Sequence, residues 1–395
     1  MIEERFIRYV KFDTQSDEAS DTTPSTAKQL KLAEELKKEC EELGFDSVKL
    51  IDGTVYAVLN GQENRTPIGL VAHMDTASEL TGANVKPRKI EKYDGGTIVL
   101  NEKYSMSPED FPVLSKVVGD DLIVTDGSTL LGADDKAGIA IIMEAMDRLI
   151  HSDKEHGLIA VAFTPDEEIG RGIDHFRLEE FPVDFAYTVD GGDPRNIDYE
   201  TFNAAEAVVE IAGKAIHPGD AKDKMINAAL LAVEFAGLLP ADEIPAKTSG
   251  RQGFYHLVHI EGEVDHAKLV YILREHDWEK FEHQKQTIEK AADTLNARYG
   301  KRVSVKIHDQ YKNMKEYMHG DMRSVERAQR ALEKAGLEPR SVAVRGGTDG
   351  AMLTVKGLIT PNLGTGSANH HGRYEFADLQ KMEQMVDVVL NILEE

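Results

Sequence analysis

Residues 68–72, Ile-Gly-Leu-Val-Ala, form a continuous apolar run that ends at His73. A strand without polar residues is typical of a sheet that is covered on both faces. Further apolar runs at 55–59 and 158–163 alternate with a helical pattern at 137–150, and this order predicts an α/β domain whose mixed sheet is covered by helices. His73 would then lie where a strand leaves the sheet, which is where ligand sites gather in such folds.

The charge of the chain limits its partners. It has 46 Lys and Arg residues against 70 Asp and Glu residues, a net charge of −24. This charge repels phosphate backbones and anionic lipids, so neither nucleic acid nor a membrane is expected as a partner. The first residues are acidic and amphipathic rather than basic and apolar, so we expect no signal peptide and a cytoplasmic location. The single cysteine, Cys40, lies on an apolar helical stripe and is expected to be a buried structural thiol.

The length of 395 residues favours two domains. From about residue 206 the pattern has the order β-α-β-β-α-β of a ferredoxin-like α+β unit. Its expected elements are strand 207–212, helix 224–239, strands 255–260 and 268–274, helix 278–299 and strand 302–308. The apolar residues Trp278, Phe281, Ile288, Leu295 and Tyr299 are expected to form one buried face of its second helix. The predicted domains are therefore a catalytic domain, 1–205 with 319–395, and an inserted lid domain, 206–318.

The remaining elements of the first domain show weaker patterns. A helix is expected over 25–43, ending at Gly44, which is a good C-terminal cap. The polar stretch between 85 and 126 contains short strand-like runs, which predict a hairpin excursion that returns to the main sheet. After the insertion we expect helices at 324–335 and 379–393 and a short strand at 358–362.

Acidic residues stand at the ends of other buried elements. Glu167 and Glu168 follow the strand 158–164, Asp190 follows an apolar run, and Asp134 precedes the helix 137–150. A buried carboxylate is costly unless a cation or a hydrogen-bond donor compensates its charge. Two imidazoles and three such carboxylates suit zinc, cobalt or manganese. One carboxylate between two ions would hold them about 3.5–4 Å apart, the spacing of a two-metal hydrolytic site.

At these residues the chain resembles the co-catalytic zinc metallopeptidases of the M20 clan and, within them, the tripeptide aminopeptidases. The resemblance runs nearly end to end. Its motifs are Phe12-Asp13-Thr-Gln-Ser, Ala72-His73-Met-Asp75-Thr, Gly132-Ala-Asp134-Asp-Lys-Ala-Gly138, Thr164-Pro-Asp-Glu167-Glu168-Ile-Gly170, Tyr187-Thr-Val-Asp190-Gly-Gly, Ile216-His217-Pro-Gly, Gly346-Gly-Thr348-Asp349-Gly350 and Asn369-His-His371-Gly.

The resemblance implies a set of metal ligands for two Zn²⁺ ions per chain, with Co²⁺ or Mn²⁺ as further options. His73 and Asp190 would hold one ion, Glu168 and His371 the other, and Asp134 would bridge them. Two neighbouring residues match no ligand position: Asp135 is expected to start a helix, where the dipole favours an acid, and His370 precedes the matching histidine. Asp75 would orient His73 by accepting a hydrogen bond from its other ring nitrogen.

Catalysis and substrate binding follow from the same resemblance. Glu167 would act as the general base that takes a proton from the metal-bridging water and passes it to the leaving amine. Arg274 would pair with the terminal carboxylate of a short peptide substrate. His217 and Asn227 would reach the substrate and the oxyanion. The lid is of the dimerisation type in this family, which leaves open a homodimer formed through it.

These features predict a dinuclear zinc aminopeptidase that releases the N-terminal residue of tripeptides. One alternative is a related M20 hydrolase that acts on dipeptides or N-acyl amino acids, because the metal ligands would be shared. Another is a metal-binding homologue without catalysis, although such a protein would not need Glu167. The residues Gly346 and Gly347 lack the Gly-x-Gly-x-x-Gly spacing of a dinucleotide-binding loop, so a dehydrogenase gains no support.

Overall fold

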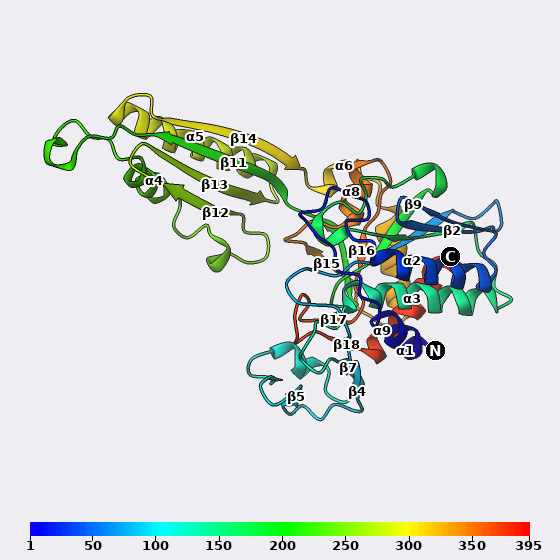
Figure 1. Ribbon diagram of the computed structural model, residues 1–395. Coiled ribbons are helices and arrows are strands. Elements are labelled where there is room, and N and C mark those ends of the chain that lie inside the picture. Colours follow the sequence, from blue (N-terminus) through cyan, green and yellow to red (C-terminus); the bar gives the residue numbers. More distant parts are fainter. The chain divides into compact units, whose positions relative to one another are not determined.

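The computed structural model describes residues 1–395, and its chain divides into two compact units (Figure 1). Unit 1 comprises Met1–Tyr199, Tyr317–Val342 and Thr348–Glu395, and unit 2 comprises Glu200–Glu316 and Ala343–Gly347. The roles assigned to the two parts from the sequence, catalysis and lid, stay predictions.

A mixed sheet of eight strands forms the centre of unit 1. In spatial order its strands are β1 (Ser47–Ile51), β2 (Thr54–Leu59), β8 (Ile159–Thr164), β3 (Ile68–His73), β9 (Phe185–Val189), β16 (Asn362–Leu363), β10 (Asn196–Glu200) and β15 (Arg340–Ala343). β3 runs parallel to both of its neighbours, β8 and β9, whereas β1, β2 and β8 pair antiparallel in turn. The predicted α/β fold with a mixed sheet is confirmed.

Alternate residues of the central strands face two different cores. On β8, Ile159, Val161 and Phe163 join the helical core, while Ala160 and Ala162 join a second core on the opposite face. This period of two is the geometry of a strand that is buried on both sides. The first face is covered by α1 (Ile2–Tyr9), α2 (Gln29–Leu43), α3 (Ala133–Ile150), α7 (Arg323–Lys334) and α9 (Leu379–Glu394). The second is covered by aromatic residues between 173 and 181 and by α8 (Asp349–Val355).

The polar stretch between residues 85 and 126 does not return to the main sheet, so that expectation was wrong. Its strand β7 (Leu122–Val124) belongs to a separate sheet of order β17-β18-β7-β4, with β17 (Ser367–Ala368), β18 (Phe376–Asp378) and β4 (Arg88–Ile90). A two-stranded pair, β5 (Ile98–Val99) with β6 (Ser105–Met106), completes the excursion. The reason is long-range pairing: β18 comes from the C-terminal part of the chain and packs with β7 over a small core of its own.

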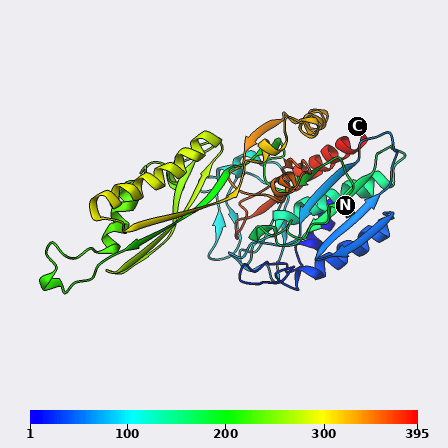
Figure 2. The ribbon, with the colours of Figure 1, turned by 90° about the horizontal axis from the view of Figure 1, so that it is seen from above.

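Unit 2 has the ferredoxin-like fold that the sequence predicts. Its elements are β11 (Asn203–Ala212), α4 (Ala228–Gly237), β12 (Phe254–Gly262), β13 (His266–Glu275), α5 (Trp278–Tyr299) and β14 (Val303–Tyr311). The strands pair antiparallel in the order β12-β13-β11-β14. Both helices pack on one face of this sheet, as Figure 2 shows from above.

Several expected details differ at the ends of elements. Trp278 and Tyr299 were expected on the buried face of α5, but both lie at its ends and are 36% and 38% exposed. The expected strand at 358–362 is reduced to β16, and a short helix α6 (Met314–Tyr317) follows β14. Cys40 is buried as expected, and its burial raises the pKa of the thiol. None of the helices is both long and apolar enough to cross a bilayer.

Candidate metal centre

His73 ends β3, and its side chain is 1% exposed. Its Nε2 lies 2.9 Å from Asp134 Oδ1, and its Nδ1 lies 3.3 Å from Asp75 Oδ1 and 3.1 Å from the Asp75 carbonyl oxygen. Burial opposes a charge on the imidazole, but hydrogen bonds to Asp134 and Asp75 outweigh it and raise the pKa of His73 well above its usual value. Asp75 therefore contacts the ring nitrogen that the sequence analysis assigned to it.

Asp75 also holds the acidic turn that follows β8. Its two carboxylate oxygens accept the backbone N–H groups of Glu167, at 2.9 Å, and Glu168, at 3.2 Å. Asp75 is fully buried, so these bonds fix the turn without competition from solvent. One carboxylate thus orients an imidazole and two neighbouring glutamates.

The other four expected ligands come from four further segments and gather around His73 and Asp134. His73 Nε2 lies 4.0 Å from Asp190 Oδ2, at the end of β9. His371 Nε2 lies 3.0 Å from Glu168 Oε2 and 3.4 Å from Asp134 Oδ2. Asp134 thus points one oxygen at each imidazole, which is the arrangement that a bridging carboxylate needs.

The electrostatics of this cluster favour a cation. Burial, together with the surrounding carboxylates, raises the pKa values of Glu167, Glu168 and Asp190. Hydrogen bonds to Asp134 and Glu168 raise the pKa of His371 to about 11. Glu168 Oε1 is buried and has no hydrogen-bond partner. An unsatisfied buried carboxylate oxygen among other acids suits a divalent cation, so the residues present fit such an ion.

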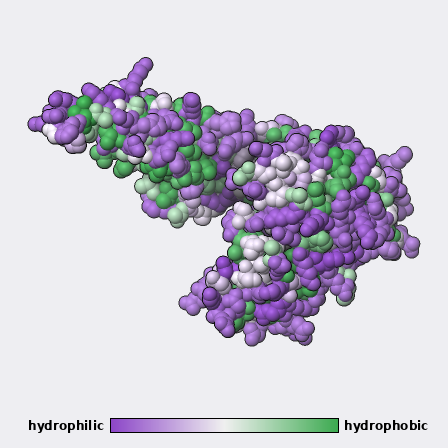
Figure 3. All heavy atoms as spheres, in the orientation of Figure 1, coloured by the Kyte–Doolittle hydropathy of each residue, from purple (hydrophilic) through white to green (hydrophobic).

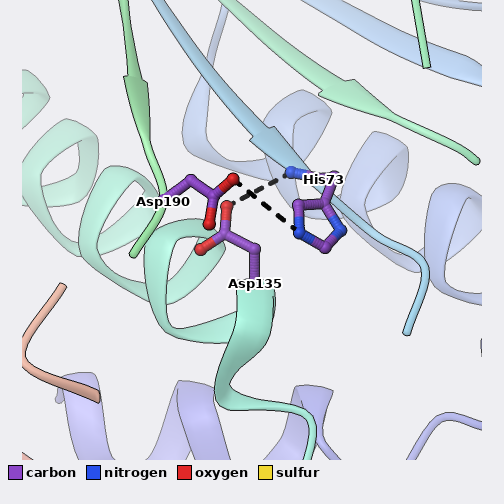
Figure 4. A group of neighbouring side chains, drawn as sticks. All are labelled: His73, Asp135 and Asp190. Carbon is purple, nitrogen blue, oxygen red and sulfur yellow. Dashed lines mark hydrogen bonds and ion pairs between the residues drawn. The ribbon is translucent and has the colours of Figure 1, made fainter. Parts of the chain in front are cut away.

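Asp135 lies closer to this cluster than its expected role at a helix start requires. Its Oδ2 accepts the backbone N–H of His73, at 3.3 Å, and its Oδ1 accepts that of Gly138, at 3.2 Å. Figure 4 shows Asp135 between His73 and Asp190. Two candidate metal groups result, His73 with Asp135 and Asp190, and His73 with Asp134 and Glu168. Because backbone amides occupy both Asp135 oxygens, Asp134 is the better candidate for a ligand that bridges two ions.

His370 and His371 have different contacts. His370 Nε2 bonds Ser367 Oγ at 2.8 Å, and its Nδ1 lies 3.6 Å from Asp134 Oδ2, a longer distance than that from His371. His370 also lines a cavity of about 760 Å³ in unit 1. Other residues around this cavity include apolar Val113, Val117, Leu337 and Phe376 and cationic Lys116, Arg195, Arg340 and Lys381. Because His371 lies closer to Asp134 than His370 does and also contacts Glu168, the geometry favours His371 as the ligand.

Three buried acids near the ligand cluster were not predicted from the sequence to be functional residues. Asp166 adopts a left-handed conformation, with φ of 58°, and its carboxylate accepts hydrogen bonds from Ser25 and Gln29. Asp349 accepts a hydrogen bond of 2.6 Å from Thr164 Oγ1, and burial raises its pKa to about 7. Glu375 accepts the backbone amides of Leu131, Gly132 and Asp134. The motifs include Asp166 and Asp349, but nothing in the sequence pattern shows what they bind.

The three candidate substrate-binding residues lie in unit 2. His217 is exposed, and its Nδ1 accepts the Gly219 amide at 3.1 Å. Asn227 caps α4, since its Oδ1 accepts the Leu230 amide at 3.2 Å. Arg274 donates to the carbonyl oxygens of Leu273 and Ala205 at 2.9 and 3.4 Å. Their roles in substrate binding stay predictions.

Comparison with known proteins places the chain in a family. The model of Peptidase family M20/M25/M40 matches residues 126–395. The chain is 51% identical to Peptidase T of Desulfitobacterium hafniense (strain Y51), over 99% of this chain and 97% of that protein. The chain belongs to peptidase family M20/M25/M40. It is also 50% identical to Peptidase T of Clostridium perfringens (strain 13), over 99% and 98% of the two chains. The resemblance drawn from the sequence motifs is confirmed.

Solved structures of peptidases share the fold. Aminopeptidase PepT from Bacillus cereus superposes with a TM-score of 0.79 at 25% identity, covering 100% of this chain and 97% of that one. A tripeptidase from Staphylococcus aureus has the same TM-score at 22% identity, with the same coverage. A Bacillus subtilis protein described as a dinuclear metal-binding peptidase of the M20 family has a TM-score of 0.63 at 14% identity, covering 100% and 96%.

Proposed function

We propose that this M20 peptidase is an aminopeptidase that uses two divalent cations to release the N-terminal residue of tripeptides. The observation that carries the proposal is the convergence of two imidazoles and three carboxylates, contributed by five separate segments, at one end of the central sheet. The motif resemblance to tripeptide aminopeptidases, together with Peptidase T relatives about half identical over the full chain, supports tripeptides as substrates over the dipeptides and N-acyl amino acids of the alternative.

The residues present would divide between two ions. His73 and Asp190 would hold one, Glu168 and His371 would hold the other, and Asp134 would contribute one oxygen to each. Zinc suits these nitrogen and oxygen donors, and cobalt or manganese would also fit. Bound there, such ions polarise the scissile carbonyl and lower the pKa of a coordinated water.

Glu167 is the general base in this proposal. Its backbone amide is bound by Asp75, and its Oε2 lies 4.0 Å from His73 Nε2, at the edge of the ligand cluster. Burial, together with the nearby carboxylates of Asp190 and Asp349, raises the pKa of Glu167, which favours the protonated form that this carboxyl adopts after it accepts a proton. Glu167 takes a proton from the attacking water and delivers it to the amine that leaves.

Arg274 would recognise the C-terminal carboxylate of the peptide. Its guanidinium lies 5.4 Å from the centre of the Tyr311 ring, and no Asp or Glu pairs with it. Arg274 is half-buried, and its burial lowers the pKa of the guanidinium. A partly buried arginine without an acidic partner is suited to bind a carboxylate ligand in a bidentate way. His217 and Asn227 would contact the rest of the substrate.

A panel of di-, tri- and tetrapeptides tests the substrate class. We expect the highest kcat/KM for tripeptides with both ends free, no turnover of N-blocked peptides, and weaker turnover of C-amidated tripeptides. Faster hydrolysis of dipeptides or N-acyl amino acids would favour the alternative M20 activity.

Arg274→Ala tests the carboxylate contact on the same panel. For free-acid tripeptides, kcat/KM should fall by an amount equivalent to about 2–5 kcal/mol, the usual loss for one partner of a buried charge pair. C-amidated tripeptides already lack the charge and should lose little more. Equal losses for both substrates would show that Arg274 has only a structural role.

A homodimer formed through unit 2 is the second part of the proposal. Four large apolar side chains of α4 and β12 are exposed: Leu230 (68%), Val233 (65%), Ile260 (49%) and Val258 (44%). Figure 3 shows hydrophobic residues gathered over this part of unit 2. An exposed apolar patch of this kind is typical of a protein interface. We therefore propose that this patch pairs two copies of the chain.

A further inference from the structure

Glu375 is a buried acid that the proposed mechanism does not use. It lies four residues after His371 and directly before β18, and it is 1% exposed. Its Oε2 accepts the backbone N–H groups of Leu131 and Gly132, at 2.9 and 2.7 Å. Its Oε1 accepts the N–H of Asp134 at 2.9 Å. One carboxylate therefore binds three amides of the turn that carries Asp134.

We propose that Glu375 is a positioning residue that fixes the Asp134 turn to the His371 segment and thereby sets the spacing of the two metal sites. The inference rests on the proposed two-metal function. Asp134 and His371 are separated by more than two hundred residues, yet Asp134 Oδ2 and His371 Nε2 must stay within a few tenths of an ångström of their positions to share an ion. Glu375 is the direct link between their two backbones.

The turn depends on this link because it lacks an anchor of its own. The residue before α3, Gly132, offers no side-chain cap, and Asp134 departs from helical dihedral angles. The three amides therefore have no helical partners, and Glu375 satisfies all of them. Buried amides without acceptors are rare in folded proteins, so the turn would have to rearrange if the carboxylate were removed.

The contacts of Glu375 exclude it from a ligand role. Both of its oxygens already accept hydrogen bonds from backbone amides. The positive charge that balances Glu375 comes from the buried ammonium of Lys136, which also donates a hydrogen bond of 2.8 Å to the Phe12 carbonyl oxygen. Asp75 acts in the same way on the opposite loop, where it binds the amides of Glu167 and Glu168. Two buried acids thus hold the two ligand-bearing turns.

Glu375→Gln tests the inference, because glutamine keeps the shape but replaces one acceptor oxygen with a donor. Full-length metal-free protein is titrated with Co²⁺, followed by its visible absorption, and with Zn²⁺ against a competing chelator. We expect the Kd of at least one ion to rise by about 10- to 100-fold, as for other residues that orient metal ligands. The Co²⁺ spectrum should also change, and at saturating metal kcat should fall while KM stays near the parent value.

Asp378→Asn is the matched control. Asp378 lies three residues further on, is fully buried, and accepts two backbone amides, those of Gln380 and Lys381, at 3.1 Å each. These amides begin α9 rather than the turn that carries Asp134. Asp378→Asn should therefore lower the melting temperature but leave both Kd values within about twofold of the parent.

The outcomes separate this inference from the proposed function. Metal affinities of Glu375→Gln equal to those of Asp378→Asn would overturn the positioning role, whatever the melting temperatures. If Glu375→Gln does not fold, Glu375→Asp decides. It keeps the charge without the full reach, so the Kd of at least one ion should exceed the parent value; parental affinity would overturn the inference. A parent protein that binds no second ion would instead refute the two-metal function.

Discussion

Glu167 and Glu168 are neighbours whose side chains face different partners. Glu168 Oε2 lies 3.0 Å from His371, whereas Glu167 approaches His73 at 4.0 Å. We expect Glu167→Gln to lower kcat by about 10²–10⁴-fold while metal content stays at the parent level, because the variant would lose the proposed general base but no proposed ligand. Glu168→Gln should instead lower metal content. Turnover assays and elemental analysis of both purified variants check this assignment, and exchanged phenotypes would reverse it.

At the residue scale, the sequence could reveal side chains that follow buried strands. His73 and Asp190 end β3 and β9, so their expected position at one edge of the sheet could be read from apolar runs. Glu375 could not be found in this way. Its partners are backbone amides between 241 and 244 residues away, and backbone groups leave no trace in the pattern of side chains.

Gly138 shows how one element positions another. A Cβ atom at this residue of α3 would lie 1.8 Å from the carbonyl oxygen of Val189, the residue before Asp190. Gly138→Ala must therefore move α3 away from β9, which we expect to lower the free energy of unfolding by about 1–3 kcal/mol and to weaken metal retention. Denaturant titration and metal analysis measure the two effects.

Gly237→Ala is the control for this prediction. Gly237 ends α4, and a Cβ there would meet no atom within 4 Å. Alanine should therefore be tolerated or stabilise the protein by up to about 1 kcal/mol through its helix propensity. If Gly138→Ala were as stable as Gly237→Ala, the close contact of α3 with β9 would not constrain the metal centre.

At the element scale, periodicity predicted most helices and strands but not every partner. The apolar stripe of α2 and the strand-like runs at 207–212 and 268–274 predicted the type of α2, β11 and β13, although β11 begins four residues earlier than expected. The strand β7 was foreseen, but its sheet was not, because its partner β18 lies some 250 residues further along the chain. Such pairing depends on the folding of the whole unit and leaves only a weak local signal.

At the scale of the whole molecule, the order β-α-β-β-α-β was sufficient to identify the ferredoxin-like unit. That order allows few sheet topologies, and the observed sequence of strands, β12-β13-β11-β14, is the one it implies. Trp278 and Tyr299 were placed on the wrong surface because they stand at the two ends of α5, beyond the sheet that covers its middle. Helical periodicity predicts on which side of a helix a residue lies, but not how far along the helix the sheet extends.

The exposed patch on α4 and β12 leads to a prediction for the assembly. β12 is an edge strand of its sheet and packs against α4, so its exposed Val258 and Ile260 lie beside the helix that carries exposed Leu230 and Val233. An apolar surface next to an open strand edge is usually covered in solution. We expect the protein to have twice its chain mass of 43.8 kDa by light scattering, because two copies would bury this patch against each other.

Charges placed in the patch should separate the copies. The double variant Val233→Glu, Ile260→Lys is expected to be monomeric by light scattering. Its circular dichroism spectrum should be unchanged, because both side chains are about half exposed or more, so the charges would not enter the core. Lys306→Glu on β14, the opposite edge of the same sheet, is the matched control and should remain dimeric. A parent protein that is monomeric at every concentration would show that there is no dimer interface. A double variant that stays dimeric would show that the interface lies elsewhere. If instead only the patch variant dissociates, the two edges of one sheet differ in function: β12 with α4 joins two chains, whereas β14 remains in solvent.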